Sequence, residues 1–132
     1  MFQKNKIILP IKIDNMHWAT AVIYIHRKEI RIFDSMGVNR DIYLEALLQF
    51  VKDSWNIIHN GLSFPDSQQW NLLRNTNEIS IQKEEYDCGV FCCMYADCIS
   101  NDSDLNFSNE NIEQKRRFIK ETIEKNNYIN IE

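Results

Sequence analysis

The sequence predicts an α+β fold, in which a small, mostly antiparallel sheet is flanked by helices. The N-terminal part holds short runs rich in β-branched residues with polar turns between them, the pattern of strands joined by hairpins. Later segments place apolar residues at three- and four-residue spacing, the pattern of helices that pack one face on a sheet. At 132 residues the chain is long enough to bury a hydrophobic core. We therefore expect residues 1–132 to form a single domain.

Two strands are expected first. Residues 7–13, Ile-Ile-Leu-Pro-Ile-Lys-Ile, are short and β-branched, and Pro10 favours an edge position or a bulge because proline cannot donate to a β-ladder. Residues 18–25, Trp-Ala-Thr-Ala-Val-Ile-Tyr-Ile, are apolar almost throughout. This near-continuous apolarity indicates a strand that is covered on both faces.

A hairpin is expected to join the second strand to a third. Residues 26–29 are polar, and residues 30–33 alternate with period two. The hairpin carries His17 and Asp34 to the same end of neighbouring strands. Counting outward from a turn centred near residues 27 and 28 leaves His17 about four residues beyond the direct partner of Asp34. We therefore expect a bulge or a bend at the strand end to bring the two side chains together.

An amphipathic helix follows the third strand, with Asn39 as its expected cap and Asp41 in its first turn. Its apolar stripe comprises Tyr43, Leu44, Leu47, Leu48, Val51 and Trp55. Glycine, proline and aspartate predict a loop over residues 60–69. A short strand is expected over residues 70–73, and an irregular segment with little to pack over residues 78–85.

A final helix is expected to begin near Ser108 or Asn109, with Ile112, Ile119 and Ile123 on one side. Its basic residues are interpreted as a solvated face rather than a binding patch. They are Lys115, Arg116, Arg117 and Lys120.

The segment that carries the chemistry is a helix expected to begin at Cys88 and to end by about Asn101. Asp87 precedes it and is a preferred N-cap residue, because its carboxylate can accept hydrogen bonds from unpaired first-turn N–H groups. A thiol at this end of a helix lies near the positive pole, which favours the thiolate. Gly89 lets a substrate carbonyl approach backbone N–H groups that can stabilise an oxyanion. Cys88 is therefore a candidate nucleophile.

Composition and charge exclude several function classes. The net charge is −4, so the basic footprint expected of a nucleic-acid binder is missing. The apolar runs are too short to span a bilayer, and the first residues lack the apolar core of a signal peptide. We expect an intracellular protein of the nucleus or cytoplasm, monomeric, with no nucleic-acid or membrane partner.

The four cysteines suggest a metal cluster as an alternative, and their spacing argues against it. No Cys-x-x-Cys pair is present, and Cys92 and Cys93 point about 100° apart on a helix. Free thiols are usual inside the cell. We expect no metal and no cofactor, with Cys92, Cys93 and Cys98 acting as small buried hydrophobes.

Nucleophilic cysteine catalysis needs a thiolate, an imidazole that moves its proton, and a group that orients the imidazole. Cys88, His17 and Asp34 can fill these roles, with Trp18 shielding the ion pair from water and Gln82 as a second oxyanion donor. The residues alone leave a structural role for His17 and a plain loop role for Gln82 open. The acidic side chains just before Cys88 oppose a thiolate, although solvent screening weakens them.

Several motifs resemble, in order and spacing, the catalytic domain of the SUMO-specific cysteine proteases, also called sentrin-specific or ubiquitin-like-protein proteases, which are relatives of adenain. They are His17-Trp18, residues 33–37 (Phe-Asp-Ser-Met-Gly) and the stretch from Gln82 through Asp87-Cys88-Gly89-Val90-Phe91. The resemblance extends to residues 9–11, 95–99 and 106–108 and to Trp70, so it covers nearly the whole chain. Three motifs in the right order are a specific signal.

The resemblance implies roles for particular residues. His17 would be the general base, Asp34 its orienting partner, Cys88 the nucleophile and Gln82 the oxyanion-hole residue. Trp18 would line a narrow tunnel for the substrate's Gly-Gly tail, which selects glycine by excluding side chains. The fold would be that of the adenain-like cysteine proteases, with the nucleophile at the start of a central helix.

The implied function is hydrolysis of the peptide or isopeptide bond after a C-terminal Gly-Gly of SUMO or another ubiquitin-like protein. Two alternatives stay open: a protease for ubiquitin or another modifier, and a non-catalytic remnant or modifier-binding module. The chain departs from the family at Ile81, where a second glutamine is frequent, and near Glu85 and Tyr86, where a small residue is usual. We also expect it to lack the family's N-terminal substrate-binding segment, as a fragment, a truncated product or a minimal form.

Overall fold

The structure is a computed structural model of the chain, and it describes residues 1–65, 69–74, 79–105, 107 and 109–126. Its sheet has the strand order β1-β2-β3-β4, and the strands are β1 Lys6–Ile13, β2 His17–Tyr24, β3 Glu29–Phe33 and β4 Asn71–Leu73. The first two pairings are antiparallel, and β4 lies parallel to β3. The predicted small, mostly antiparallel sheet is confirmed, and Pro10 lies on the edge strand β1.

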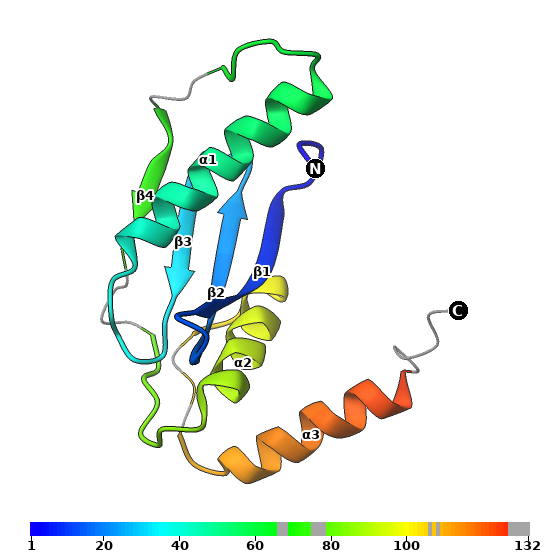
Figure 1. Cartoon of the computed structure of the whole chain (residues 1–132). Helices are drawn as coiled ribbons and strands as arrows, with labels where there is room; N and C mark the ends of the chain where they lie inside the picture. The colour runs from blue at the N-terminus through cyan, green and yellow to red at the C-terminus, as the bar shows by residue number, and fades with distance from the viewer. Residues whose placement is uncertain (66–68, 75–78, 106, 108, 127–132) are drawn as a thin grey trace.

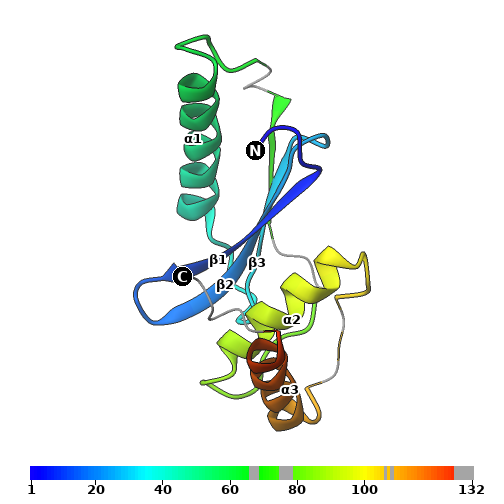
Figure 2. The ribbon, with the colours of Figure 1, turned by 90° about the vertical axis from the view of Figure 1, so that its right-hand side faces the viewer.

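The described residues form three helices: α1 Asp41–Ile58, α2 Cys88–Ser100 and α3 Ile112–Lys125. α1 covers one face of the sheet and α2 the opposite face, so the sheet is the middle layer (Figures 1 and 2). α3 leaves this three-layer body near the start of α2 and extends away from the sheet (Figure 1). α3 has no buried residue.

Alternation along β2 divides the hydrophobic core into two clusters. Ala19, Ala21 and Ile23 belong to the cluster on the α1 face, which also contains Leu44 and Val51 of α1. This confirms the predicted amphipathic helix. Side chains on the other face pack with α2, and that cluster comprises Val22, Phe33, Ile79, Phe91, Tyr95 and Ile99. β2 is therefore buried on both faces, as its composition predicts.

Two polar contacts fix α2 along the sheet, one from β2 and one from Lys6 of β1. The Thr20 hydroxyl is fully buried and donates to the carbonyl oxygen of Cys92 at 2.9 Å. At the other end of the helix, Lys6 Nζ donates to the carbonyl oxygen of Ile99 at 2.6 Å and pairs with Asp102 at 2.8 Å. A cation at a helix C-terminus satisfies carbonyls that lack an intrahelical partner. These contacts set the position of α2 relative to β1 and β2.

The expected hairpin register was wrong by one residue on each strand. The last pair of the hairpin is Tyr24 with Glu29, so the turn is centred between residues 26 and 27, and Lys28 has a left-handed φ of 54°. Thr20 pairs with Phe33, and extending this register places Asp34 opposite Ala19. His17 is then only two residues beyond the partner of Asp34.

Several local expectations also need correction. Arg40, not Asn39, occupies the N-cap of α1. α3 begins at Ile112, later than expected, because Asn111 adopts a left-handed φ of 60°. Ile79 and Ser80 are buried in a segment expected to have little to pack. Cys93 is exposed rather than buried, whereas Cys92 and Cys98 are buried as expected.

Some expectations fall on residues outside the described ranges. Residues 60–65 form no helix or strand, as expected for a loop, while residues 66–68 are not among those described. The same holds for Glu78, at the start of the irregular segment, and for Asn106 and Ser108, which belong to a motif of the family resemblance.

Candidate active site

His17 and Asp34 form a buried pair at the end of the sheet. Nε2 of His17 lies 2.8 Å from Oδ1 of Asp34, and the exposed fractions of the two residues are 8% and 0%. The corrected register explains this contact, because residues two apart on a strand share a face and the diagonal neighbour across the ladder is within reach of a long side chain. No bulge is needed.

Asp34 is held from two further directions. The Met36 N–H donates to Oδ1 at 2.8 Å, and Nε of Arg40 donates to Oδ2 at 2.6 Å. A carboxylate anchored in this way fixes the plane of the imidazole. Because Nε2 of His17 faces the carboxylate and carries the proton in the neutral ring, Nδ1 is left as the basic nitrogen.

The helix register brings Cys88 to the same end of the sheet. Thr20 bonds to Cys92, and Cys88 precedes Cys92 by four residues, about 6 Å along an α-helix. The same step back along β2 from Thr20 is about two residues, which is Trp18, the neighbour of His17. The Cys88 side chain is partly exposed. Within the described residues, no hydrogen bond joins it to His17.

The thiols of Cys92 and Cys98 are buried, whereas that of Cys88 is partly exposed. Burial raises the pKa of Cys92, although the hydrogen bond from Thr20 offsets part of this effect. Burial also raises the pKa of Cys98. Both side chains therefore stay protonated near neutral pH and are poor nucleophiles. Of the two cysteines that are not buried, Cys88 and Cys93, Cys88 is the one at the start of α2.

Gln82 lies beside the residue that follows Asp34. Its backbone N–H donates to the Ser35 carbonyl at 2.8 Å, and the Ser35 hydroxyl donates to its side-chain oxygen. The side-chain amide donates to the carbonyl oxygens of Glu84 at 2.9 Å and Glu85 at 3.4 Å. The second of these bonds is long. In this conformation the amide is directed into its own loop.

Trp18 and Gly89 are both accessible at this end of the molecule. Trp18 is 40% exposed, with Nζ of Lys12 5.7 Å from its ring centroid. A side chain built on Gly89 would meet nothing within 4 Å. The backbone N–H groups of Cys88, Gly89 and Val90 have no hydrogen-bond acceptor in the described part of the chain. The start of α2 thus offers unfilled donors beside the thiol.

Comparison with known proteins decides the family. The model of the Ulp1 protease family, C-terminal catalytic domain, matches residues 1–128. The chain belongs to the Ulp1 protease family. Human sentrin-specific protease 2 is 33% identical over 114 residues, a match that covers 82% of this chain and 18% of that protein. Ubiquitin-like-specific protease 1A of Arabidopsis thaliana is 29% identical over 106 residues, with coverage of 80% and 20%.

Solved structures agree with the sequence comparison. The SUMO protease Ulp1 with its catalytic cysteine oxidised to a sulfonic acid superposes with a TM-score of 0.73 and 26% identity, over 92% of this chain and 54% of that one. The C-terminal Ulp1 protease domain in complex with SMT3, the yeast ortholog of SUMO, gives 0.68 and 27%, over 87% and 50%. The predicted Ulp1-like α+β fold is confirmed. The chain spans about a fifth of the curated relatives and about half of these solved chains.

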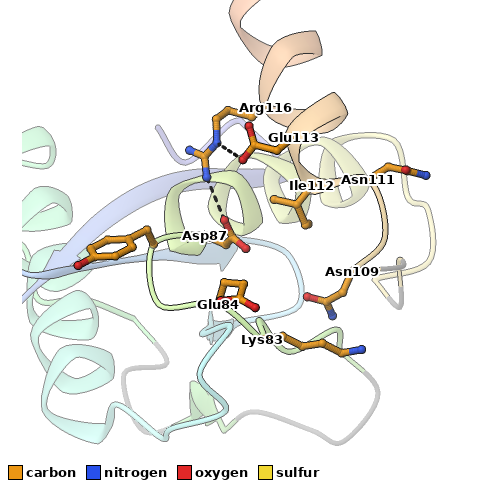
Figure 3. A pocket seen from close by; sticks show the side chains of 9 residues that line it. Lys83, Glu84, Asp87, Asn109, Asn111, Ile112, Glu113 and Arg116 are labelled. Atoms are coloured by element: carbon orange, nitrogen blue, oxygen red, sulfur yellow. Dashed lines mark hydrogen bonds and ion pairs between the residues drawn. The ribbon is translucent and has the colours of Figure 1, made fainter.

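One expectation about this Ulp1-family site is wrong. Asp87 occupies the N-cap position of α2, but its side chain makes no capping hydrogen bond. Its backbone has φ −93° and ψ 0°, whereas an N-cap residue is usually extended. Oδ1 of Asp87 instead accepts a hydrogen bond from Nη2 of Arg116, on α3, at 2.9 Å. Figure 3 shows this pair at the side of a pocket of about 540 Å³.

Sequence reasoning missed the residues that support the site. Arg40 holds Asp34 from the start of α1, Thr20 fixes α2 along β2, and Arg116 pairs with Asp87. The sequence predicts a solvated face for Arg116, since its spacing on the helix gives no sign of a distant partner. A lone threonine within the apolar run of β2 was a usable signal for Thr20, because a buried hydroxyl requires a partner.

Neither a membrane-spanning segment nor a metal cluster is found in the described ranges. None of the helices there combines the length and the apolarity that crossing a bilayer requires. No group of three or more histidine, cysteine, aspartate or glutamate side chains there is arranged to hold a metal ion.

Proposed function

We propose that this chain is the catalytic part of a cysteine protease that cleaves the peptide or isopeptide bond after the C-terminal Gly-Gly of a SUMO-like modifier. The observation that carries the proposal is the buried His17–Asp34 pair, 2.8 Å apart, at the end of the sheet to which the α2 register brings Cys88. Membership of the Ulp1 protease family supports it, as does a relative solved in complex with SMT3, the yeast ortholog of SUMO.

In the proposed reaction, His17 accepts the thiol proton of Cys88 and Asp34 stabilises the imidazolium. The thiolate attacks the glycine carbonyl, and the negative oxygen of the tetrahedral intermediate is bound by the first-turn N–H groups of α2 and by Gln82. His17 then protonates the leaving amine, which departs and leaves a thioester. Water, deprotonated by His17, releases the modifier and restores the thiol.

Two side-chain movements accompany this scheme. Nδ1 of His17 and Sγ of Cys88 close to hydrogen-bond distance, as catalytic contacts often tighten only when substrate is bound. Gln82 exchanges its bond to the Glu85 carbonyl, 3.4 Å long, for one to the substrate oxygen. The half-exposed Trp18 provides a flat wall along which a side-chain-free Gly-Gly segment can lie.

A probe experiment tests the proposal. SUMO bearing a C-terminal thiol-reactive group should label the wild-type protein and should not label Cys88→Ala. Cys93→Ala is the matched control, because Cys93 is an exposed thiol on the same helix, and its labelling should equal that of the wild type. His17→Ala should abolish turnover of a SUMO precursor.

Each alternative gives a different result. Labelling by a ubiquitin probe in place of the SUMO probe would assign the site to ubiquitin. A folded wild-type protein that neither probe labels would favour a non-catalytic, modifier-binding chain. Normal turnover by His17→Ala would contradict its role as the base.

A further inference from the structure

Asp87 is a helix-capping residue that does not cap. It directly precedes Cys88, and its carboxylate is mostly buried, with 11% of the side chain exposed. A carboxylate at this position normally accepts a hydrogen bond from the second or third residue of the helix, here Gly89 or Val90. Both N–H groups lack an acceptor within the described residues. The capping hydrogen bond that the residue type of Asp87 favours is therefore not formed.

A capping Asp87 would obstruct the chemistry proposed for this site. Its carboxylate would occupy the Gly89 or Val90 N–H, which belong to the group of donors that face the space beside Cys88. It would also place a negative charge at the end of the helix, opposing both the thiolate and the oxyanion. The cap that stabilises an ordinary helix is thus harmful where the first turn must receive a developing anion.

Arg116 is the group that holds the carboxylate elsewhere. It comes from the first half of α3 and reaches Oδ1 of Asp87 at 2.9 Å, while its Nε lies 3.6 Å from Oε1 of Glu113 (Figure 3). Glu113 lies one turn earlier on α3, and its side chain and that of Arg116 are 82% and 46% exposed, so this second pair contributes little. Ile112 is partly buried and packs against the α2-side core, and Nζ of Lys115 lies 5.4 Å from the ring centroid of Phe107, but α3 itself has no buried residue.

We propose that Arg116 is a positioning residue, which draws the Asp87 carboxylate away from the start of α2 and so leaves the first-turn N–H groups to the substrate's oxyanion. The inference rests on the proposed function for the meaning of those donors. In this proposal α3 supplies the cation, Arg116, that keeps the Asp87 side chain from capping α2. Without Arg116, the backbone of Asp87 turns from φ −93° and ψ 0° to the extended conformation of a capping residue, and its carboxylate takes a first-turn N–H.

Amide hydrogen exchange measured by NMR tests this directly and does not depend on turnover. In the wild type, the N–H groups of Gly89 and Val90 should exchange fast. In Arg116→Gln, at least one of them should become protected by about tenfold or more, since a cap supplies an acceptor. Arg117→Gln removes the same charge from an exposed neighbour on α3, and it should leave both exchange rates at the wild-type value.

Steady-state kinetics on a SUMO precursor give the second readout. Occupying one oxyanion donor should lower the kcat of Arg116→Gln by about ten- to a hundredfold, with little change in KM. Arg116→Lys keeps the charge and should recover much of the loss. In an Asp87→Ala background, Arg116→Gln should have no further effect on kcat, because the competing carboxylate is gone.

The outcomes separate the inference from the proposed function. Unchanged exchange of Gly89 and Val90 in a folded Arg116→Gln protein overturns the inference, whatever the enzyme does. New protection with an unchanged kcat also overturns it, since the cap would then not compete with catalysis. An additive loss in the Asp87→Ala background would show a merely structural Arg116. A wild type without protease activity contradicts the proposed function, while the exchange data still judge Arg116.

Discussion

Arg40→Met should destabilise the folded protein by about 2 kcal/mol. Nε of Arg40 donates to Oδ2 of Asp34 at 2.6 Å, and the side chains of Arg40 and Asp34 are 18% and 0% exposed, so solvent screens this pair little. Hydrogen bonds to charged groups contribute about 1.5–3 kcal/mol. Removing one partner of a fully isolated buried pair costs about 3–5 kcal/mol. In Arg40→Met, Asp34 retains its bonds to His17 and Met36, so we expect the loss of stability to fall in the lower of these two ranges.

Thermal and urea denaturation followed by tryptophan fluorescence measure this loss. About 2 kcal/mol corresponds to a fall in Tm of about 8 °C for a domain of this size. Arg74→Met is the matched control, because Arg74 pairs with Asp41 at the same 2.6 Å distance, yet the two side chains are 64% and 49% exposed. An exposed pair of this kind contributes at most about 1 kcal/mol.

The comparison between the two variants is what tests the reasoning. If Arg40→Met and Arg74→Met lower the free energy of unfolding equally, burial does not set the strength of these pairs. If Arg40→Met leaves Tm unchanged, the carboxylate of Asp34 finds full compensation elsewhere, and the argument for Arg40 as its anchor fails.

Two further stability predictions concern the α2 side of the sheet. Thr20→Val keeps the side-chain shape but removes the buried hydrogen bond to Cys92. Urea denaturation should therefore show a free energy of unfolding that is lower by about 1 kcal/mol. Thr122→Val is the control, because it removes an exposed bond to a helix carbonyl and should change this free energy little. Alkaline pH should also destabilise the fold: burial raises the pKa of Cys92 and Tyr95 above their ordinary values of 9.0 and 10.0, so the unfolded chain loses these protons first. Urea midpoints should stay level below about pH 8 and fall from about pH 9 upward; a midpoint that rises there would contradict the burial of these groups.

The strands and helices were predictable because their signals are local. The β-branched, apolar run of β2 and the three- and four-residue spacing of α1 depend on neighbours within a few positions. The hairpin register depended on where the turn begins, and a left-handed Lys28, φ 54°, is not a turn signal as glycine or asparagine would be. Because the expected register is wrong by one residue on each strand, the sequence predicts a bulge or bend between His17 and Asp34. In the structure they are diagonal neighbours across the ladder.

The candidate site is predicted in part by the side chains that nucleophilic catalysis requires and in part by the order of the motifs in the family resemblance. The structure brings two of the three residues, His17 and Asp34, to 2.8 Å, and the catalytic roles stay a prediction. Asp87 shows the limit of such reasoning: its position predicts a cap, and only the fold reveals that Arg116, 29 residues later in the sequence, takes the carboxylate instead. Tertiary contacts of this length leave no periodic trace in the sequence.

The pairing of β2 with both β3 and α2 has a consequence for the order of assembly. His17 and Asp34 are separated by 17 residues, whereas the bond between Thr20 and Cys92 spans 72. Closing the shorter loop costs less chain entropy, so the hairpin can bring His17 and Asp34 together while later segments are still emerging from the ribosome. The Cys88 thiol joins them only when α2 docks, so a nascent or clipped chain that stops before Cys88 already has the His17–Asp34 pair but lacks the candidate nucleophile.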